Sequence, residues 1–108
     1  MTTEKFPEPP EAYREFIQEY PELGDAWQLL NQAGQKGPLD EKMQRLLKLA
    51  IAMGAMREGA VNSNVRKSLA MGVTKQELLQ IVSLCAGTLG LPATVALYTW
   101  VKRHCHTT

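Results

Sequence analysis

The sequence predicts an all-α fold of about six helices. Apolar residues recur at spacings of three and four along most of the chain, as in amphipathic helices, and no stretch alternates as a half-buried strand does. Proline and glycine residues divide this pattern into segments. We expect helices over about residues 10–20, 23–34, 40–56, 60–71, 75–86 and 92–103.

The chain is expected to consist of an N-terminal arm and one domain. Residues 1–8 are expected to be extended, because Pro7, Pro9 and Pro10 do not permit a regular start to a helix. Residues 9–108 are expected to form a single domain, since a length of 108 residues and a hydrophobic fraction of 44% are ordinary for one globular unit.

The region from about residue 42 to residue 72 is expected to form a helical hairpin. Asp40 is a suitable N-cap for the helix that follows it, which is apolar around most of its circumference and is therefore expected to be buried on several sides. Arg57, Glu58 and Gly59 form the expected joint, and Gly72 ends the second helix of the hairpin. Glu58 is thus expected in the angle between two packed helices.

The last two helices have clear local boundaries. Thr74 and Glu77 have the spacing of a capping box, in which each side chain bonds the backbone N–H of the other residue. Gly87, Gly90 and Pro92 interrupt the pattern before the final helix.

The charge and hydropathy of the chain exclude several classes of function. The formal net charge is +1 and there is no basic run, so neither nucleic acid nor a membrane is expected as a partner. No apolar run approaches the roughly 20 residues that span a bilayer, and the polar start resembles no signal peptide. A cytoplasmic location is therefore expected.

The two cysteines, Cys85 and Cys105, form no CxxC motif. Cys85 lies in an apolar segment and is expected to be a small core residue. Cys105 lies between His104 and His106, but three ligands near a chain end do not complete a usual metal site. We expect no metal and no other cofactor.

The apolar surface exceeds what one small domain easily covers. The third and fifth expected helices are apolar nearly all round, and several of the five methionines lie on them. Burial between subunits is expected to cover the surplus, so a homo-oligomer is favoured over a monomer.

Three stretches resemble the carboxymuconolactone decarboxylase and alkylhydroperoxidase-D-like family. They are LDEKMQRLLKLAIAM at 39–53, the spacing from Glu58 to the turn AMGVTKQEL at 70–78, and TLGLPA at 88–93. The resemblance covers about residues 27–100 and implies an all-helical fold, an active site on a helical hairpin, and assembly as trimers or hexamers. It also implies either thiol peroxidase chemistry, with a CxxC motif, a glutamate and a histidine, or decarboxylation of a lactone acid without a cofactor.

Matching the stretch VRKSLAMG to the family pattern places the family histidine at Asn64 and the two CxxC positions at Arg57 and Ala60. Thiol–disulfide exchange needs a thiolate, which neither position provides, so peroxidase or disulfide reductase activity is not expected. Glu58 falls where the decarboxylases have an Arg-Glu pair, and its carboxyl is the candidate proton donor.

Two hypotheses follow. The first is a cofactor-independent lyase acting on a small organic acid, with Glu58 as the catalytic acid in a cavity lined by the third, fourth and fifth helices, and with Arg57, Asn62, Asn64 and Cys85 binding the substrate. The second is a non-catalytic, ligand-binding scaffold, in which Glu58 pairs with Arg57 or Arg66 or favours the start of its helix. The histidines near the C-terminus can contribute only if the tail folds back.

Overall fold

The structure, a computed structural model, describes residues 11–105, which contain six α-helices and no strand. The helices are α1 (Glu11–Glu19), α2 (Pro21–Gly34), α3 (Glu41–Gly54), α4 (Glu58–Ala70), α5 (Lys75–Leu89) and α6 (Leu91–Lys102). The predicted all-α class is therefore confirmed. The predicted arm over residues 1–8 lies outside the described residues.

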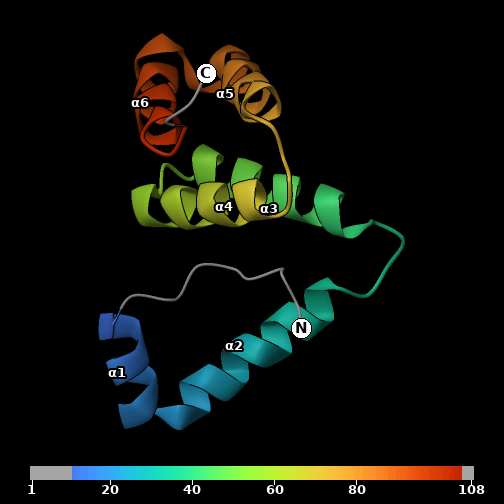
Figure 1. Ribbon diagram of the computed structural model, residues 1–108, viewed down its shortest axis with the longest axis vertical. Helices are drawn as coiled ribbons and strands as arrows, with labels where there is room; N and C mark the ends of the chain where they lie inside the picture. Colours follow the sequence, from blue (N-terminus) through green and yellow to red (C-terminus); the bar gives the residue numbers. More distant parts are fainter. Residues whose placement is uncertain (1–10, 106–108) are drawn as a thin grey trace.

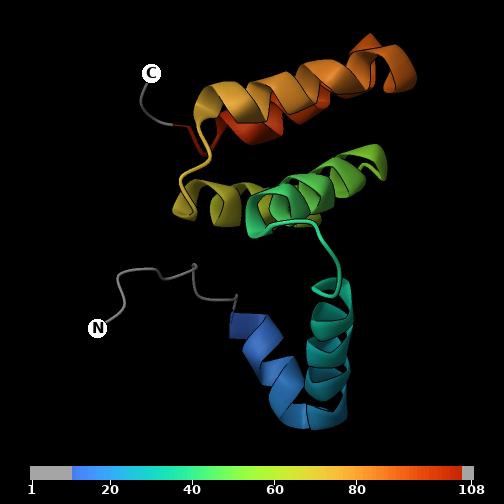
Figure 2. The same cartoon turned by 90° about the vertical axis from the view of Figure 1, so that its right-hand side faces the viewer.

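The helices are arranged as three antiparallel pairs (Figure 1). The α3–α4 pair lies in the middle, the α5–α6 pair covers one side of it, and the α1–α2 hairpin lies on the other side. Figure 2 shows the same arrangement after a quarter turn, with the α1–α2 hairpin standing away from the other four helices.

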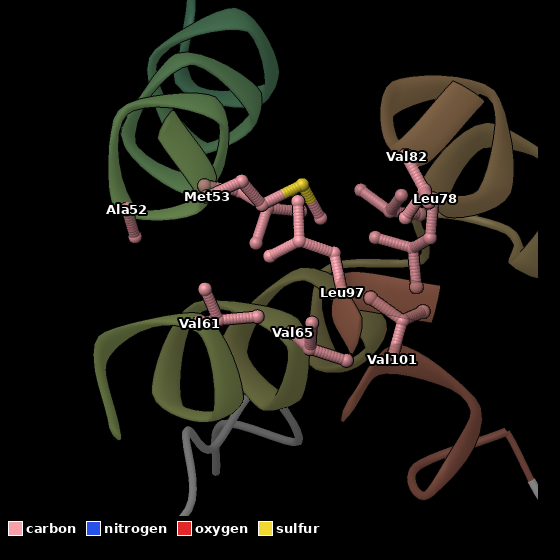
Figure 3. Packing of buried hydrophobic residues seen from close by; sticks show 10 residues of the cluster. Ala52, Met53, Val61, Val65, Leu78, Val82, Leu97 and Val101 are labelled. Atoms are coloured by element: carbon pink, nitrogen blue, oxygen red, sulfur yellow. The ribbon is translucent and has the colours of Figure 1, made fainter. Parts of the chain in front are cut away.

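The hydrophobic core lies between α3, α4, α5 and α6. Side chains from all four helices converge in it (Figure 3). Its buried apolar members are Leu49, Ala52, Met53, Val61, Val65, Val73, Leu78, Val82, Leu97 and Val101. Nine of the ten lie on the four helices at spacings of three or four residues, as amphipathic packing requires.

The α1–α2 hairpin contributes no buried residue to this core. Pro21 ends α1 and occupies the first turn of α2, where its missing N–H is not needed. A Cβ at Gly24 would lie 2.9 Å from Cγ2 of Ile17, so glycine permits the close approach of the two helices. The hairpin thus holds together locally while leaving its apolar side chains exposed.

The joint between α3 and α4 differs from the prediction. We expected Arg57, Glu58 and Gly59 to form the joint and a helix to start near Ala60, but α4 begins at Glu58 and Gly59 lies inside it. Met56 makes the turn instead, with φ of 54°. The hydrogen bond from the N–H of Val61 to the carbonyl of Arg57, at 2.8 Å, begins the helix, and an acid in its first turn is favoured by the helix dipole.

The two expected local signals at the start of α5 are both present. The N–H of Glu77 donates to Oγ1 of Thr74 at 3.1 Å, and the N–H of Thr74 donates to Oε1 of Glu77 at 2.9 Å, which completes the capping box. At the other end, Gly90 has φ of 88° and separates α5 from α6. A residue with a side chain would be strained there.

Candidate functional site

A cavity of about 740 Å³ lies between α2, α3 and α4. Its volume is in the range of small-molecule sites. The wall from α2 includes Trp27, Leu30 and Asn31, the wall from α3 includes Arg45, Lys48, Ile51 and Ala52, and the wall from Arg57 and α4 includes Ala60, Ser63, Asn64 and Lys67. We expected a cavity between the third, fourth and fifth helices; here α2 supplies the third wall and α5 does not contribute.

The lining is cationic. Arg45, Lys48, Arg57 and Lys67 all line the cavity, and none of the described residues around it is an Asp or a Glu. Four positive side chains with no carboxylate beside them among the described residues favour the binding of an anion. The chain as a whole carries a net charge of only +1, so this concentration of charge is local.

Asn64, at the position that the resemblance assigns to a histidine, holds one of these cations. Its Oδ1 accepts a hydrogen bond of 2.7 Å from the guanidinium of Arg45, and its Nδ2 donates to the carbonyl of Ala60 at 2.9 Å. Both ends of the amide are therefore engaged within the protein. Asn64 lines this cavity and its hydrogen bond positions Arg45, while its expected role in binding substrate stays a prediction.

Lys67 lies one turn after Asn64, on the same face of α4. Burial, followed by the nearby charges of Arg45, Lys48 and Arg66, lowers the pKa of its ammonium group. Burial also lowers the pKa of Arg45. No acid among the described residues pairs with Lys67, so its charge is not neutralised there.

Glu58 does not line this cavity. Its Oε2 pairs with a guanidinium nitrogen of Arg103 at 2.9 Å, and both side chains are about half exposed, at 47% and 51%. The pairing partner predicted for the scaffold hypothesis, Arg57 or Arg66, is thus replaced by Arg103 from the end of α6. The catalytic role of Glu58 stays a prediction, and the structure places its carboxylate outside the described cavity.

The segment after α6 does fold back onto α4. Nε2 of His104 lies 2.9 Å from Oδ1 of Asn62, one turn after Glu58. Asn62, expected to bind substrate, therefore bonds with a histidine of the same chain. His106 lies outside the described residues.

Cys85, another expected binding residue, lies near the core. Its Sγ is 3.4 Å from the carbonyl of Ile81 and 4.0 Å from the sulfur of Met53, and it does not line the cavity. Burial raises the pKa of its thiol, which disfavours the reactive thiolate.

Among the described residues, no three His, Cys, Asp or Glu side chains come together as a metal site would require. Within the same part of the chain, no helix has both the length and the apolar character needed to cross a membrane.

The cationic cluster was not predicted from the sequence. Lys48 and Lys67 are nineteen residues apart, on helices whose pairing brings them to one cavity. A signal was present, since basic residues recur at 45 and 48 and at 66 and 67 on the two helices of a predicted hairpin. Whether these basic residues face one another depends on how far each helix is rotated about its own axis, and the periodicity of apolar residues defines that angle only roughly.

Comparison with known proteins supports the expected relationship. The model of the carboxymuconolactone decarboxylase family matches residues 21–103, which include α2 to α6 and every residue named around the cavity. No curated protein and no solved structure gives a significant match. With most of its length matched to the family model, the chain belongs to the carboxymuconolactone decarboxylase family.

Proposed function

We propose that this protein binds a small organic acid in the cavity between α2, α3 and α4 and acts on it as a cofactor-independent lyase. The observation that supports the proposal is the lining of four cations without a described acid. A carboxylate entering the cavity offsets the repulsion among these side chains, and arginine and lysine are well suited to binding carboxylates.

The cavity also offers apolar surface beside its charged side chains. Trp27, Leu30 and Ile51 supply apolar surface, whereas Lys48, Arg57 and Lys67 supply charge. A mostly apolar site with a few polar groups is typical of sites for small molecules. An acid with a carboxylate and a short carbon skeleton matches both parts.

Arg57 is the expected binding residue that fits this proposal most directly. It lines the cavity immediately before α4, and its guanidinium can hold a carboxylate through two parallel hydrogen bonds. In the proposal, Asn64 acts through Arg45, and Asn62 and Cys85 lie outside the cavity described here.

The test measures binding and turnover separately. Succinate, malonate and acetate are titrated by calorimetry against wild type, Arg57→Gln and Glu58→Gln. We expect dicarboxylates to bind wild type and to lose at least about tenfold in affinity in Arg57→Gln, since a charge-assisted bidentate contact contributes roughly 1.5–3 kcal/mol. Glu58→Gln is expected to bind normally, because its carboxylate does not line the cavity. Absence of binding to wild type would contradict the proposal.

The ligand-binding scaffold is the second candidate, supported by the replacement of the family histidine and of the CxxC residues. Both candidates require binding, but only the lyase releases CO₂ from lactone or oxo acids. A CO₂-release measurement distinguishes them. If Glu58 donates the proton in the lyase, Glu58→Gln abolishes release while binding persists; unchanged release in the variant removes Glu58 from the mechanism.

A further inference from the structure

We propose that the side-chain amine of Lys67 is a nucleophile that forms a Schiff base with a β-oxo acid bound in the cavity between α2, α3 and α4. This inference rests on the proposed function and names the substrate class and the reactive group. The reactive residue, Lys67, lies on a different face of α4 from Glu58, which pairs with Arg103.

Lys67 lies on the face of α4 that lines the cavity. Ala60, Ser63, Asn64 and Lys67 all line the cavity, and their spacing of three and four residues makes them one face of α4. Lys67 is the member of this face that carries an amine, the group that forms a Schiff base with a ketone once it has lost a proton.

Other cations lie near the amine of Lys67. The hydrogen bond between Asn64 and Arg45 holds a guanidinium one helical turn from Lys67, and Lys48 lines the same cavity. Burial and these cations lower the pKa of Lys67, which increases the fraction of neutral amine at a given pH. A lysine that is desolvated or lies next to other cations is the usual form of a Schiff-base nucleophile.

A β-oxo acid fits the charged groups of the cavity. A β-oxo acid has a carboxylate for the remaining cations and, two bonds away, a ketone for the amine. Arg57 and Lys48 are cavity residues that can hold the carboxylate while Lys67 attacks the ketone carbon. The basic residues of the cavity can therefore both hold the carboxylate and supply the amine that attacks the ketone.

The reaction balances as follows. The lone pair of the Lys67 amine attacks the ketone carbon, and the resulting carbinolamine takes up one proton and loses water to give a protonated imine. The bond between the carboxylate and its carbon then breaks, CO₂ leaves, and the bonding electron pair moves toward the imine nitrogen to give an enamine. A proton from water adds to the enamine carbon. Water finally hydrolyses the imine, which releases the ketone and restores the amine, so one proton is consumed and one CO₂ is released.

The experiment traps the imine. The full chain is incubated with acetoacetate, oxaloacetate or 3-oxoglutarate in the presence of sodium borohydride, and the modified residue is located by peptide mass spectrometry. We expect a reduced adduct on Lys67 with at least one of these probes; with acetoacetate, the adduct after loss of CO₂ is an isopropyl group. Omitting either the oxo acid or borohydride is expected to remove the adduct.

Two variants make the result specific. Lys67→Arg keeps the positive charge without a nucleophilic amine, and we expect it to bind succinate but to give no adduct. Lys75→Arg alters a lysine outside the cavity and is expected to react as wild type does. Circular dichroism checks that both variants are folded.

The outcomes separate the two proposals. If wild type binds succinate but gives no adduct with any probe, or if the adduct lies on another lysine, the inference about Lys67 is wrong and the binding proposal stands. If wild type neither binds succinate nor gives an adduct, both are wrong.

Discussion

At the scale of single residues, the clustered cations favour anion binding but destabilise the folded protein, because like charges repel one another. Lys67 lies near Arg45, Lys48 and Arg66, and its lowered pKa shows that the folded state disfavours its charged form. Such a group binds fewer protons in the folded state than in the unfolded state. The destabilisation is therefore fully present below the folded pKa and is relieved as the pH rises toward the ordinary lysine pKa.

We therefore expect Lys67→Gln to be more stable than wild type at neutral pH. Since the side chain is only partly buried, solvent screens the repulsion, and the gain is expected to be at most about 1 kcal/mol. The measurement is urea unfolding at low and high salt, with Lys75→Gln as the control. Salt should reduce the difference between Lys67→Gln and wild type. Equal stability of the two proteins at low salt would contradict this prediction.

The thiol of Cys85 provides a second test at this scale. Burial raises its pKa, so at any pH below that value its thiolate is rarer in the folded protein than in the unfolded chain. In Cys105→Ser, Cys85 is the remaining thiol. We expect the pH midpoint of its alkylation by iodoacetamide to be higher in the folded protein than in urea. An equal or lower midpoint in the folded protein would show an activated cysteine.

At the scale of elements, the start of α5 combines a cap with an ion pair. Glu77 accepts from Thr74 and also pairs with Nζ of Lys42 on α3 at 2.6 Å. The hydrogen bond from Lys42, followed by that from the backbone of Thr74, lowers the pKa of this carboxyl. One side chain thus begins α5 and connects it to the middle pair of helices.

We expect Glu77→Gln to reduce stability at neutral pH. The stabilisation from a carboxyl with a lowered pKa is present above the ordinary glutamate pKa and is lost as the pH falls through the folded-state value. The difference in unfolding midpoint between variant and wild type should therefore disappear in acid. Glu41→Gln, which alters an exposed acid in the first turn of α3, is the control. A difference that does not depend on pH would contradict the assignment.

The cap itself is tested by Thr74→Ala. Loss of an N-cap hydroxyl typically costs about 1 kcal/mol, because one N–H of the first turn is left without its partner. We expect a loss of that size in urea unfolding, with Thr74→Ser close to wild type since serine supplies the same oxygen. A Thr74→Ser variant as unstable as Thr74→Ala would indicate that the methyl group, rather than the cap, is responsible.

The elements also show which parts of the structure were predictable. Helix starts that depend on neighbouring residues, such as Asp40 for α3 and Thr74 for α5, were identified from the sequence because the capping contact spans three residues. The turn at Met56 was missed because a non-glycine residue with a positive φ has no clear local signal.

The candidate site was less predictable because several of its contacts join residues that are far apart in the sequence. Arg57 and Asn64 line the cavity between α2, α3 and α4, whereas the expected cavity lay between the third, fourth and fifth helices, so their binding roles stay predictions. The pairs of Glu58 with Arg103 and of Asn62 with His104 join residues 45 and 42 positions apart. Such contacts depend on how α6 packs against α4, and no spacing within a helix specifies that packing.

At the scale of the whole molecule, much apolar surface remains exposed in a single chain. On the α1–α2 hairpin, Phe16, Trp27 and Leu29 are 47%, 51% and 64% exposed, and Leu84 on α5 is 71% exposed. The radius of gyration is 14.9 Å, whereas a compact chain of this length has about 13 Å. A hairpin that stands away from the core and exposes apolar side chains is a surface that a second copy can cover.

We therefore expect a homo-oligomer, a trimer or a hexamer of the 12.0 kDa chain, to be measured by light scattering coupled to size-exclusion chromatography. Leu29→Glu, on a side chain of α2 that does not line the cavity, should shift the population toward monomer, because a charge on a covered apolar surface is costly. Gln28→Glu adds the same charge at the adjacent exposed position and should leave the assembly intact. A monomeric wild type would contradict the prediction. An oligomer that tolerates Leu29→Glu does not cover this position, and Leu84→Glu then tests the exposed apolar surface of α5 in the same way.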